Sequence, residues 1–430
     1  MRFFFGWWIV FVMSAVMFVT TGTFFYGFAT LVDPLNEEFG WSHALIGGAF
    51  SLRSEMGGIE GPIVGYLIDR LGPRILLVTG VALVGIGFLF LSQVHAIWGL
   101  YAAVVVIALG MGATGGPVAY TAIAHWFVKK RGRATALVTL GGGASGVMAM
   151  VLAALITAYG WRTAVFVVGL AQMAICIPLA LTVRRQPEDM GLAPDGESPL
   201  EDPLLAEKEL GEDGSSATEE GQSIHRQGAT MGQALRRSNF WFLGIAMALA
   251  GLGSMGLVVH QISYLKKSVG FSAEGAAQVA TAMTIISLAG RLGFGYLSDF
   301  VDKRKLLAVA YLLMGLGILA FAGIQSAWHV VFYLALFSPG WGASITVRPV
   351  LQAECFGLRA FAGIQGLMFL ISSVGSVAGP IFVGAVYDAS GEYRLAFLIT
   401  AVAALVAAPT VLLMSSPKPA EEAKDVIVVA

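Results

Sequence analysis

The sequence has few of the charged residues that keep the surface of a soluble protein wet. Of its 430 residues, 12% are charged and 57% are hydrophobic. Its apolar runs are far longer than the roughly 10 residues that a strand of a membrane barrel needs. The composition therefore predicts an all-α integral membrane protein, surrounded by the lipid bilayer.

Signatures of several other functional classes are missing. The two cysteines, Cys176 and Cys355, lie far apart in apolar segments, which argues against a disulfide framework and a metal site. No phosphate-binding loop or nucleophile elbow is present, so we expect neither an enzyme nor an ATP-driven pump, and no cofactor. The net charge of -1 gives no sign of nucleic-acid binding.

Twelve apolar runs are long enough to span a bilayer as helices. They cover residues 7–31, 44–68, 75–96, 99–127, 134–159, 162–183, 239–264, 274–298, 305–325, 328–353, 361–387 and 393–415. We expect four parts: a six-helix half (1–185), a linker (186–237), a second six-helix half (238–416) and a tail (417–430).

The linker and the basic residues suggest an orientation. Residues 186–232 are rich in Glu, Asp, Gly, Ser and Pro and cannot bury a core, so we predict a flexible tether, with a regulatory role as the alternative. Most Lys and Arg residues fall in segments on the same side as this linker. We therefore expect both termini to be cytoplasmic. We also expect the protein to be a monomer in a plasma (inner) membrane.

The two halves repeat each other. GYLIDRLGPRILL, from Gly65 to Leu77, matches GYLSDFVDKRKLL, from Gly295 to Leu307, and two further segments match in the same order. Three matches in order indicate an internal duplication.

The first copy carries a recognisable motif, Gly-x-Leu-x-Asp-Arg-x-Gly-x-Arg. Its residues are Gly65, Leu67, Asp69, Arg70, Gly72 and Arg74. In this the chain resembles the major facilitator superfamily of transporters, which implies two pseudo-symmetric six-helix halves, a central site and alternating access. The second copy keeps Gly295 and Asp299 but has Phe300 in place of Arg70 and Asp302 in place of Gly72, so we expect a weaker or differently paired gate.

The motif also has a physical task. Gly65 permits a close approach by a neighbouring helix, and Asp69 at the membrane edge can pair with a basic residue or cap a helix N-terminus of the other half. Such contacts hold a gate closed and do not bind substrate.

Three further segments give a narrower resemblance. FFYGFATLVDPLNEEFGWSHALI, WFVKKRGRATAL followed by GGGASG, and LAGRLGFGYLSD are similar to segments of the monocarboxylate transporters and their oxalate/formate antiporter-like bacterial relatives. The resemblance implies that Arg291 binds the substrate carboxylate through its planar fork. The animal transporters have an aspartate where this chain has Ser287 and a lysine in the first helix, whereas residues 6–32 here contain none, so the proton handling of the animal transporters is not implied. The oxalate/formate antiporters have a lysine in the eleventh helix, whereas residues 360–387 here contain none, so their selective dicarboxylate exchange is not implied either.

The position of Arg291 points the same way. It lies eight residues before Asp299, about 12 Å deep in a hydrocarbon layer of about 30 Å. A cation at that depth normally faces a cavity and marks a substrate site. The alternative is a structural arginine bound to helix carbonyls or to a buried acid.

The second predicted helix contains unusual charges. Arg53 and Glu60 share a face, whereas Glu55 points the other way, and Glu60 lies at nearly the depth of Arg291. We take Glu60 as the leading proton carrier, with Glu55 behind it. A permanent ion pair of Glu60 with Arg53 or Arg348 is the alternative.

Other polar residues are weaker candidates. Arg348, which precedes Pro349, is a possible second anion ligand or gate residue. Tyr120 and Tyr26 can offer hydroxyls to a cavity, although packing is the simpler explanation of each. His260 is a candidate because histidine can change its charge near neutral pH, but a lone interfacial histidine is usually a hydrogen-bonded packing group.

The sequence thus predicts a secondary transporter of a small organic anion, most simply a monocarboxylate moved with a proton. The anion neutralises Arg291, and a protonated carboxyl such as Glu60 lets the loaded cavity close without net charge. The alternatives are an anion exchanger without proton coupling, an exporter of drugs or neutral solutes, and a transporter-like membrane sensor.

Overall fold

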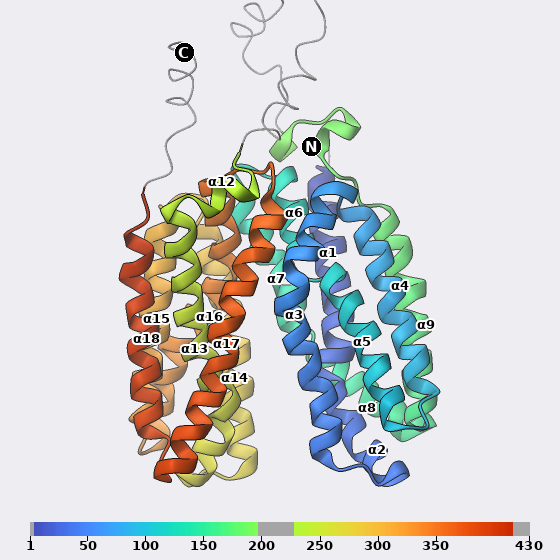
Figure 1. Ribbon diagram of the computed structural model, residues 1–430, viewed down its shortest axis with the longest axis vertical. Helices are drawn as coiled ribbons and strands as arrows, with labels where there is room; N and C mark the ends of the chain where they lie inside the picture. The colour runs from blue at the N-terminus through green and yellow to red at the C-terminus, as the bar shows by residue number, and fades with distance from the viewer. Residues whose placement is uncertain (1–3, 197–227, 416–430) are drawn as a thin grey trace, which may run out of the picture.

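The computed structural model describes residues 4–196 and 228–415, and in these residues the chain forms helices, the turns that connect them and one isolated bridge between Gly228 and Gly357. Two helical bundles stand side by side (Figure 1). The prediction of an all-α fold with two helical halves is confirmed.

The first bundle holds α1 to α9. Its helices are α1 (Phe5–Thr21), α2 (Val32–Phe39), α3 (His43–Leu71), α4 (Pro73–Ser92), α5 (Ile97–Thr114), α6 (Gly116–Trp126), α7 (Arg131–Ala144), α8 (Val147–Tyr159) and α9 (Trp161–Leu181). Three of its spans are interrupted: between α1 and α2 by a π-helical turn at Gly22–Tyr26, between α5 and α6 at Gly115, and between α7 and α8 near Ser145. Interrupted helices within a membrane are tolerated where they line a cavity or pack against protein.

The second bundle is more regular. A short helix, α12 (Met231–Leu235), leads into α13 (Ser238–Lys267), α14 (Ala273–Leu297), α15 (Lys303–Ala322), α16 (Ala327–Phe356), α17 (Phe361–Ser390) and α18 (Arg394–Leu412). Each bundle has its own core, with Trp126 and Phe88 fully buried in the first and Tyr333 and Phe397 in the second. The bundles meet where α3 lies beside α17 and α14 beside α7.

The described helices agree with the predicted spans to within a few residues, with one exception. Eleven helical spans are long and apolar enough to cross a membrane. The twelfth, α3, has 29 residues, and the charges in its middle lower its hydropathy. The exception is the first span, which continues as α2, where the Glu38 carboxylate accepts hydrogen bonds from Trp161 (2.6 Å) and Arg162 (2.8 Å).

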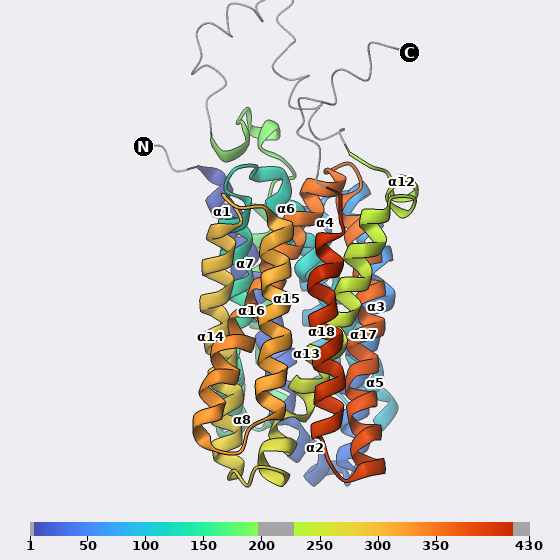
Figure 2. The ribbon, with the colours of Figure 1, turned by 90° about the vertical axis from the view of Figure 1, so that its left-hand side faces the viewer.

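The described chain begins and ends at the same end of the molecule as the linker, which we call the linker end (Figure 2). The opposite end is the far end. The prediction that the linker end is cytoplasmic rests on the Lys and Arg distribution alone.

The start of the predicted tether is ordered. Residues 187–196, here called the linker arm, form two 3₁₀ turns, and the buried Asp195 accepts backbone N–H bonds from Val128 (2.9 Å), Lys129 (2.7 Å) and Lys130 (3.1 Å). At the other end of the linker, Ala229 N–H donates to the Phe356 carbonyl. The rest of the predicted tether, 197–227, and the tail beyond 415 lie outside the described residues.

Candidate functional site

A carboxylate of the first motif copy reaches across to the second bundle at the linker end. Asp69 at the end of α3 accepts the backbone N–H groups of Ala362 (3.3 Å) and Gly363 (2.9 Å), which form the first turn of α17. Gly65, one turn earlier, lies against the Ala362 carbonyl with no room for a side chain. A carboxylate at a helix N-terminus is favourable, so Asp69 holds the two bundles together here.

The second copy makes the reciprocal contact with a different partner set. Asp299, after α14, accepts the N–H of Gly132 (2.7 Å) at the start of α7 and pairs with Arg133 Nε (2.6 Å). The Arg133 guanidinium also lies over the rings of Tyr296 (5.0 Å) and Phe300 (5.4 Å). The second gate is therefore paired differently from the first, and an ion pair supports it.

The remaining residues of the first motif copy make contacts within their own bundle or form the turn between α3 and α4. The Arg70 guanidinium lies over Tyr66 (4.6 Å), Gly72 has φ of 81° at the turn into α4, and Arg74 lies in the first turn of α4. Gly295 packs closely against α7, as Gly65 does against α17.

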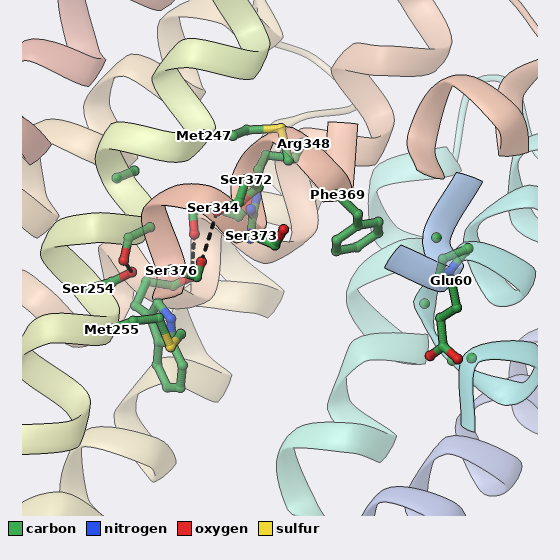
Figure 3. Close-up of a pocket in the computed structure, with 18 of the residues that line it drawn as sticks. Glu60, Met247, Ser254, Met255, Ser344, Arg348, Phe369, Ser372, Ser373 and Ser376 are labelled. Atoms are coloured by element: carbon green, nitrogen blue, oxygen red, sulfur yellow. Dashed lines mark hydrogen bonds between the residues drawn. The ribbon is translucent and has the colours of Figure 1, made fainter. Parts of the chain in front are cut away.

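A central cavity of about 380 Å³ lies between the bundles, on the far-end side of both gates. Figure 3 shows Glu60 on the wall of the first bundle and Arg348 with a group of serines on the facing wall. The second-bundle wall includes Met247, Ser254, Met255, Met314, Trp341, Ser344, Arg348, Phe369, Ser372, Ser373 and Ser376. The first-bundle wall consists mainly of Glu60, Gly61, Val64, Met111, Gly112, Gly115, Gly116 and Pro117.

Arg348 on α16 is the cation of this cavity. It lines the central cavity and also a smaller one of about 200 Å³ that it shares with Tyr120. Its Nε donates to the Ser344 carbonyl (2.6 Å), and its two terminal nitrogens have no hydrogen-bond partner among the described residues. The half-buried guanidinium therefore presents two donors to an incoming anion.

Glu60 is buried beneath the opposite wall. It is 7% exposed, and a Cβ on Gly112 of α5 would lie 2.7 Å from its carboxyl. The absence of a side chain at Gly112 thus creates the space that the carboxyl fills. The side chains of Arg53 and Glu55 lie outside the described part of the chain, so the alternative ion pair with Arg53 stays open.

Arg291 lies elsewhere than expected. It is 7% exposed, does not line the central cavity, and donates from Nη1 to the Thr139 carbonyl of α7. Tyr26 and Tyr120 lie close enough to interact with its charge. In this state Arg291 joins the two bundles through a helix carbonyl, which is the structural alternative considered above.

Of the other candidate site residues, Tyr120 lies at a cavity, whereas Ser287 and His260 bond to helix carbonyls. Tyr120 lies near both Arg291 and Arg348 and lines the smaller cavity. Ser287 is fully buried and bonds the Thr284 carbonyl of its own helix (2.6 Å). His260 donates to the Pro380 carbonyl (3.0 Å) and packs beside Tyr393, as expected of a packing histidine.

Comparison with known families now decides the class of the protein. A model of the Major Facilitator Superfamily matches residues 10–346 and 243–427. The chain belongs to the major facilitator superfamily. It is accordingly a membrane transporter and not an enzyme.

Two similar proteins of this superfamily narrow the group. The oxalate:formate antiporter of Oxalobacter formigenes is 25% identical over 405 residues, which cover 93% of this chain and 89% of that protein. Monocarboxylate transporter 12 of Rattus norvegicus is 24% identical over 389 residues, covering 87% and 77%. The suspected resemblance to this group is confirmed.

Solved structures support the fold. The human organic anion transporter MFSD10 (TETRAN) superposes with a TM-score of 0.70 at 13% identity, covering 94% of this chain and 99% of that one. The proton:xylose symporter XylE gives a TM-score of 0.71 at 17% identity, covering 94% of each chain. At these identities the likeness concerns the major facilitator fold alone.

Sequence reasoning missed most of the cavity wall. The serines of α17, Ser372, Ser373 and Ser376, and the aromatic Trp341 of α16 gave no individual signal in a chain this apolar. The spacing of Ser372 and Ser376, one helical turn apart, places them on one face, and this was the available hint.

Proposed function

We propose that this transporter carries a small organic anion by alternating access and that Arg348 binds the carboxylate. The observation that carries the proposal is the guanidinium of Arg348 in the central cavity, with both terminal nitrogens available. A planar guanidinium binds a carboxylate through two parallel hydrogen bonds and stays charged when desolvated.

The gates support the alternating-access part. Asp69 and Asp299 close the linker end, and the cavity lies beyond them toward the far end. If the linker end is cytoplasmic, this state faces outward. Rocking of the bundles about the central site would open the linker end and close the far end.

Arg291 has two possible roles that a paired experiment separates. The resemblance implies a carboxylate ligand, whereas the bond to Thr139 supports a strut between bundles. Arg348→Lys and Arg291→Lys each keep the charge and lose the fork. We expect Arg348→Lys to lose carboxylate-induced thermal stabilisation and uptake, and Arg291→Lys to keep the stabilisation but turn over more slowly.

The readout is thermal shift of purified protein together with counterflow of labelled carboxylate in vesicles. Unchanged carboxylate binding in Arg348→Gln would show that Arg348 does not bind the carboxylate. Loss of binding in Arg291→Lys alone, with correct insertion, would return the role to Arg291.

Proton coupling through Glu60 is the second part of the proposal. A buried carboxyl beside the cavity can carry a proton when the anion is bound, so that the closed, loaded state has no net charge. Glu60→Gln mimics the protonated form. Exchange of labelled for unlabelled anion should then survive, while uptake driven by a pH gradient collapses.

A fixed ion pair predicts a different result for the same variant. Its arginine partner would be left buried and uncompensated, at about 3 to 5 kcal/mol, so exchange, net uptake and thermal stability would all fall. His260→Gln serves as the control because His260 bonds a helix carbonyl outside the cavity lining. Wild-type pH-driven uptake in Glu60→Gln would exclude both roles.

Anion exchange without proton coupling is the second candidate, because a relative similar over nearly the whole chain is named an oxalate:formate antiporter. Counterflow that is insensitive to a pH gradient in the wild type would favour this exchange.

A further inference from the structure

We infer that the transported anion is a monocarboxylate with a bulky apolar or aromatic body that also carries a hydrogen-bond donor, such as an aryl 2-hydroxy acid. The inference rests on the proposed function, in which Arg348 binds the carboxylate. It is drawn from the cavity wall around that arginine.

The charges of the cavity suit one carboxylate. Of the described residues that line it, Arg348 is the one cation, and Glu60 faces it from the other bundle (Figure 3). Arg291 is turned away into α7, where it bonds Thr139. A second carboxylate on the substrate would find no second cation among these residues and would meet Glu60, apolar side chains or serine hydroxyls, which are unfavourable settings for an anion.

The surfaces of the cavity suit a bulky apolar body. Methionines and aromatics, including Met255, Met314 and Trp341, form much of one wall, while the facing wall at Gly112 and Gly116 is backbone without side chains. Methionine adapts to irregular apolar shapes, and aromatic rings favour stacking or edge contacts. A volume of about 380 Å³ falls among pockets that enclose ligands much larger than formate or acetate.

The serines of the cavity are set as acceptors. Four of the five serines among the described lining residues donate their hydroxyl hydrogens to carbonyls of their own helices: Ser254 to Gly251 (3.4 Å), Ser344 to Trp341 (2.8 Å), Ser373 to Leu370 (2.8 Å) and Ser376 to Ser372 (3.1 Å). A hydroxyl that has donated its hydrogen keeps lone pairs that accept. The wall therefore matches a hydroxyl or N–H on the substrate.

Four acids that differ in only two features test this class. Propionate, lactate, 3-phenylpropionate and 3-phenyllactate vary the phenyl ring and the hydroxyl independently. On purified full-length protein we expect the phenyl ring to tighten binding by roughly tenfold or more and the hydroxyl by roughly threefold. Malonate, a dicarboxylate as short as propionate, should bind more weakly than propionate.

Variants assign each feature to its wall. Trp341→Ala should weaken the two phenyl acids by roughly threefold to tenfold and leave propionate and lactate unchanged. Ser376→Ala should reduce the advantage of the hydroxy acids. Trp328→Ala is the matched control, because Trp328 is 79% exposed and does not line the cavity.

The outcomes separate this inference from the proposed function. Binding of propionate and lactate that depends on Arg348 but equals or exceeds that of the phenyl acids would overturn the substrate class and leave the transporter proposal standing. Binding that persists in Arg348→Gln, or no binding of any of the acids, would overturn both. Tightest binding of 3-phenyllactate, lost in Arg348→Gln and weakened in Trp341→Ala, supports both.

Discussion

The two copies of the gate motif differ in where their cation comes from. In the first copy, Arg70 lies over Tyr66 of its own helix, and Asp69 receives only backbone N–H groups from the second bundle. In the second copy, the cation is Arg133 of the opposite bundle, which pairs with Asp299 and lies over Phe300. Both copies thus place a carboxylate on a helix N-terminus, and only the second adds a charge across the interface.

The sequence differences between the copies have local explanations. Phe300, at the position of Arg70, supplies a ring under Arg133. Asp302, at the position of Gly72, caps α15 by accepting the N–H of Arg304 (2.9 Å), and the Arg304 guanidinium lowers the pKa of its carboxyl. A duplicated motif can therefore lose two of its six residues and still close, because the helix N-terminus is the shared partner.

The largest effect is expected from Asp299→Asn. The substitution removes a charge-assisted pair with Arg133 whose acid is only 2% exposed, so the open linker end should gain at least roughly tenfold in population. The alkylation rate of a cysteine placed at Gln365, which is buried on the linker side of the cavity, reports this opening. Glu354→Gln is the control, because Glu354 pairs with Lys303 inside one bundle. Equal alkylation in both variants would show that Asp299 carries no gate.

A smaller effect is expected from Asp69→Asn. It removes the charge at the α17 N-terminus but no ion pair, which corresponds to about 1 kcal/mol, or roughly fivefold in the same alkylation assay. Turnover should fall while carboxylate binding persists, because the cavity is untouched. If Asp69→Asn opens the linker end more than Asp299→Asn, the ranking of the two gates is reversed.

The next effect is indirect and comes from Asp195→Asn. Asp195 fixes the N–H groups of residues 128–130, just before the α7 turn that Asp299 caps. Asparagine tolerates the φ of 60° at this position, so the variant tests the carboxylate alone. We expect roughly threefold faster alkylation at position 365. Asp189→Asn, on the same arm, bonds only its own turn and should have no effect.

The smallest effect is expected from removing residues 197–227. With a glycine–serine segment long enough to reconnect the two sides, the linker arm and Ala229 stay in place, so uptake should stay within about twofold of wild type if the bundles are held by their helices. A deletion that starts at residue 190 also removes Asp195 and should reproduce the Asp195→Asn defect. Complete loss of uptake in a 197–227 deletion variant that is correctly inserted in the membrane would indicate regulation by that segment.

The fold was predictable because a bilayer demands long apolar helices, and the internal repeat identified even α3, whose charges lower its hydropathy. The sequence also identified Arg291 and Arg348 as cations within the helical spans. The sequence could not predict which way the two side chains point, because this depends on how α14 packs on α7 and how α16 faces the cavity. The ordered linker arm was also not predicted, because its polar composition indicated a flexible tether. Its prolines and glycines are nevertheless residues that tight turns favour: Pro187, Gly191, Pro194 and Gly196.

Where α3 meets α17, the two bundles touch backbone against backbone, with Gly61 beside Gly366 and Gly65 beside Ala362. At these two positions no side chains interdigitate, so the backbones can part there without a change of rotamer. The friction of the rocking motion should therefore be low at this seam. How long the closed state lasts is then set by the carboxylate contacts at its end, while how fast the bundles move once released is set by the glycines.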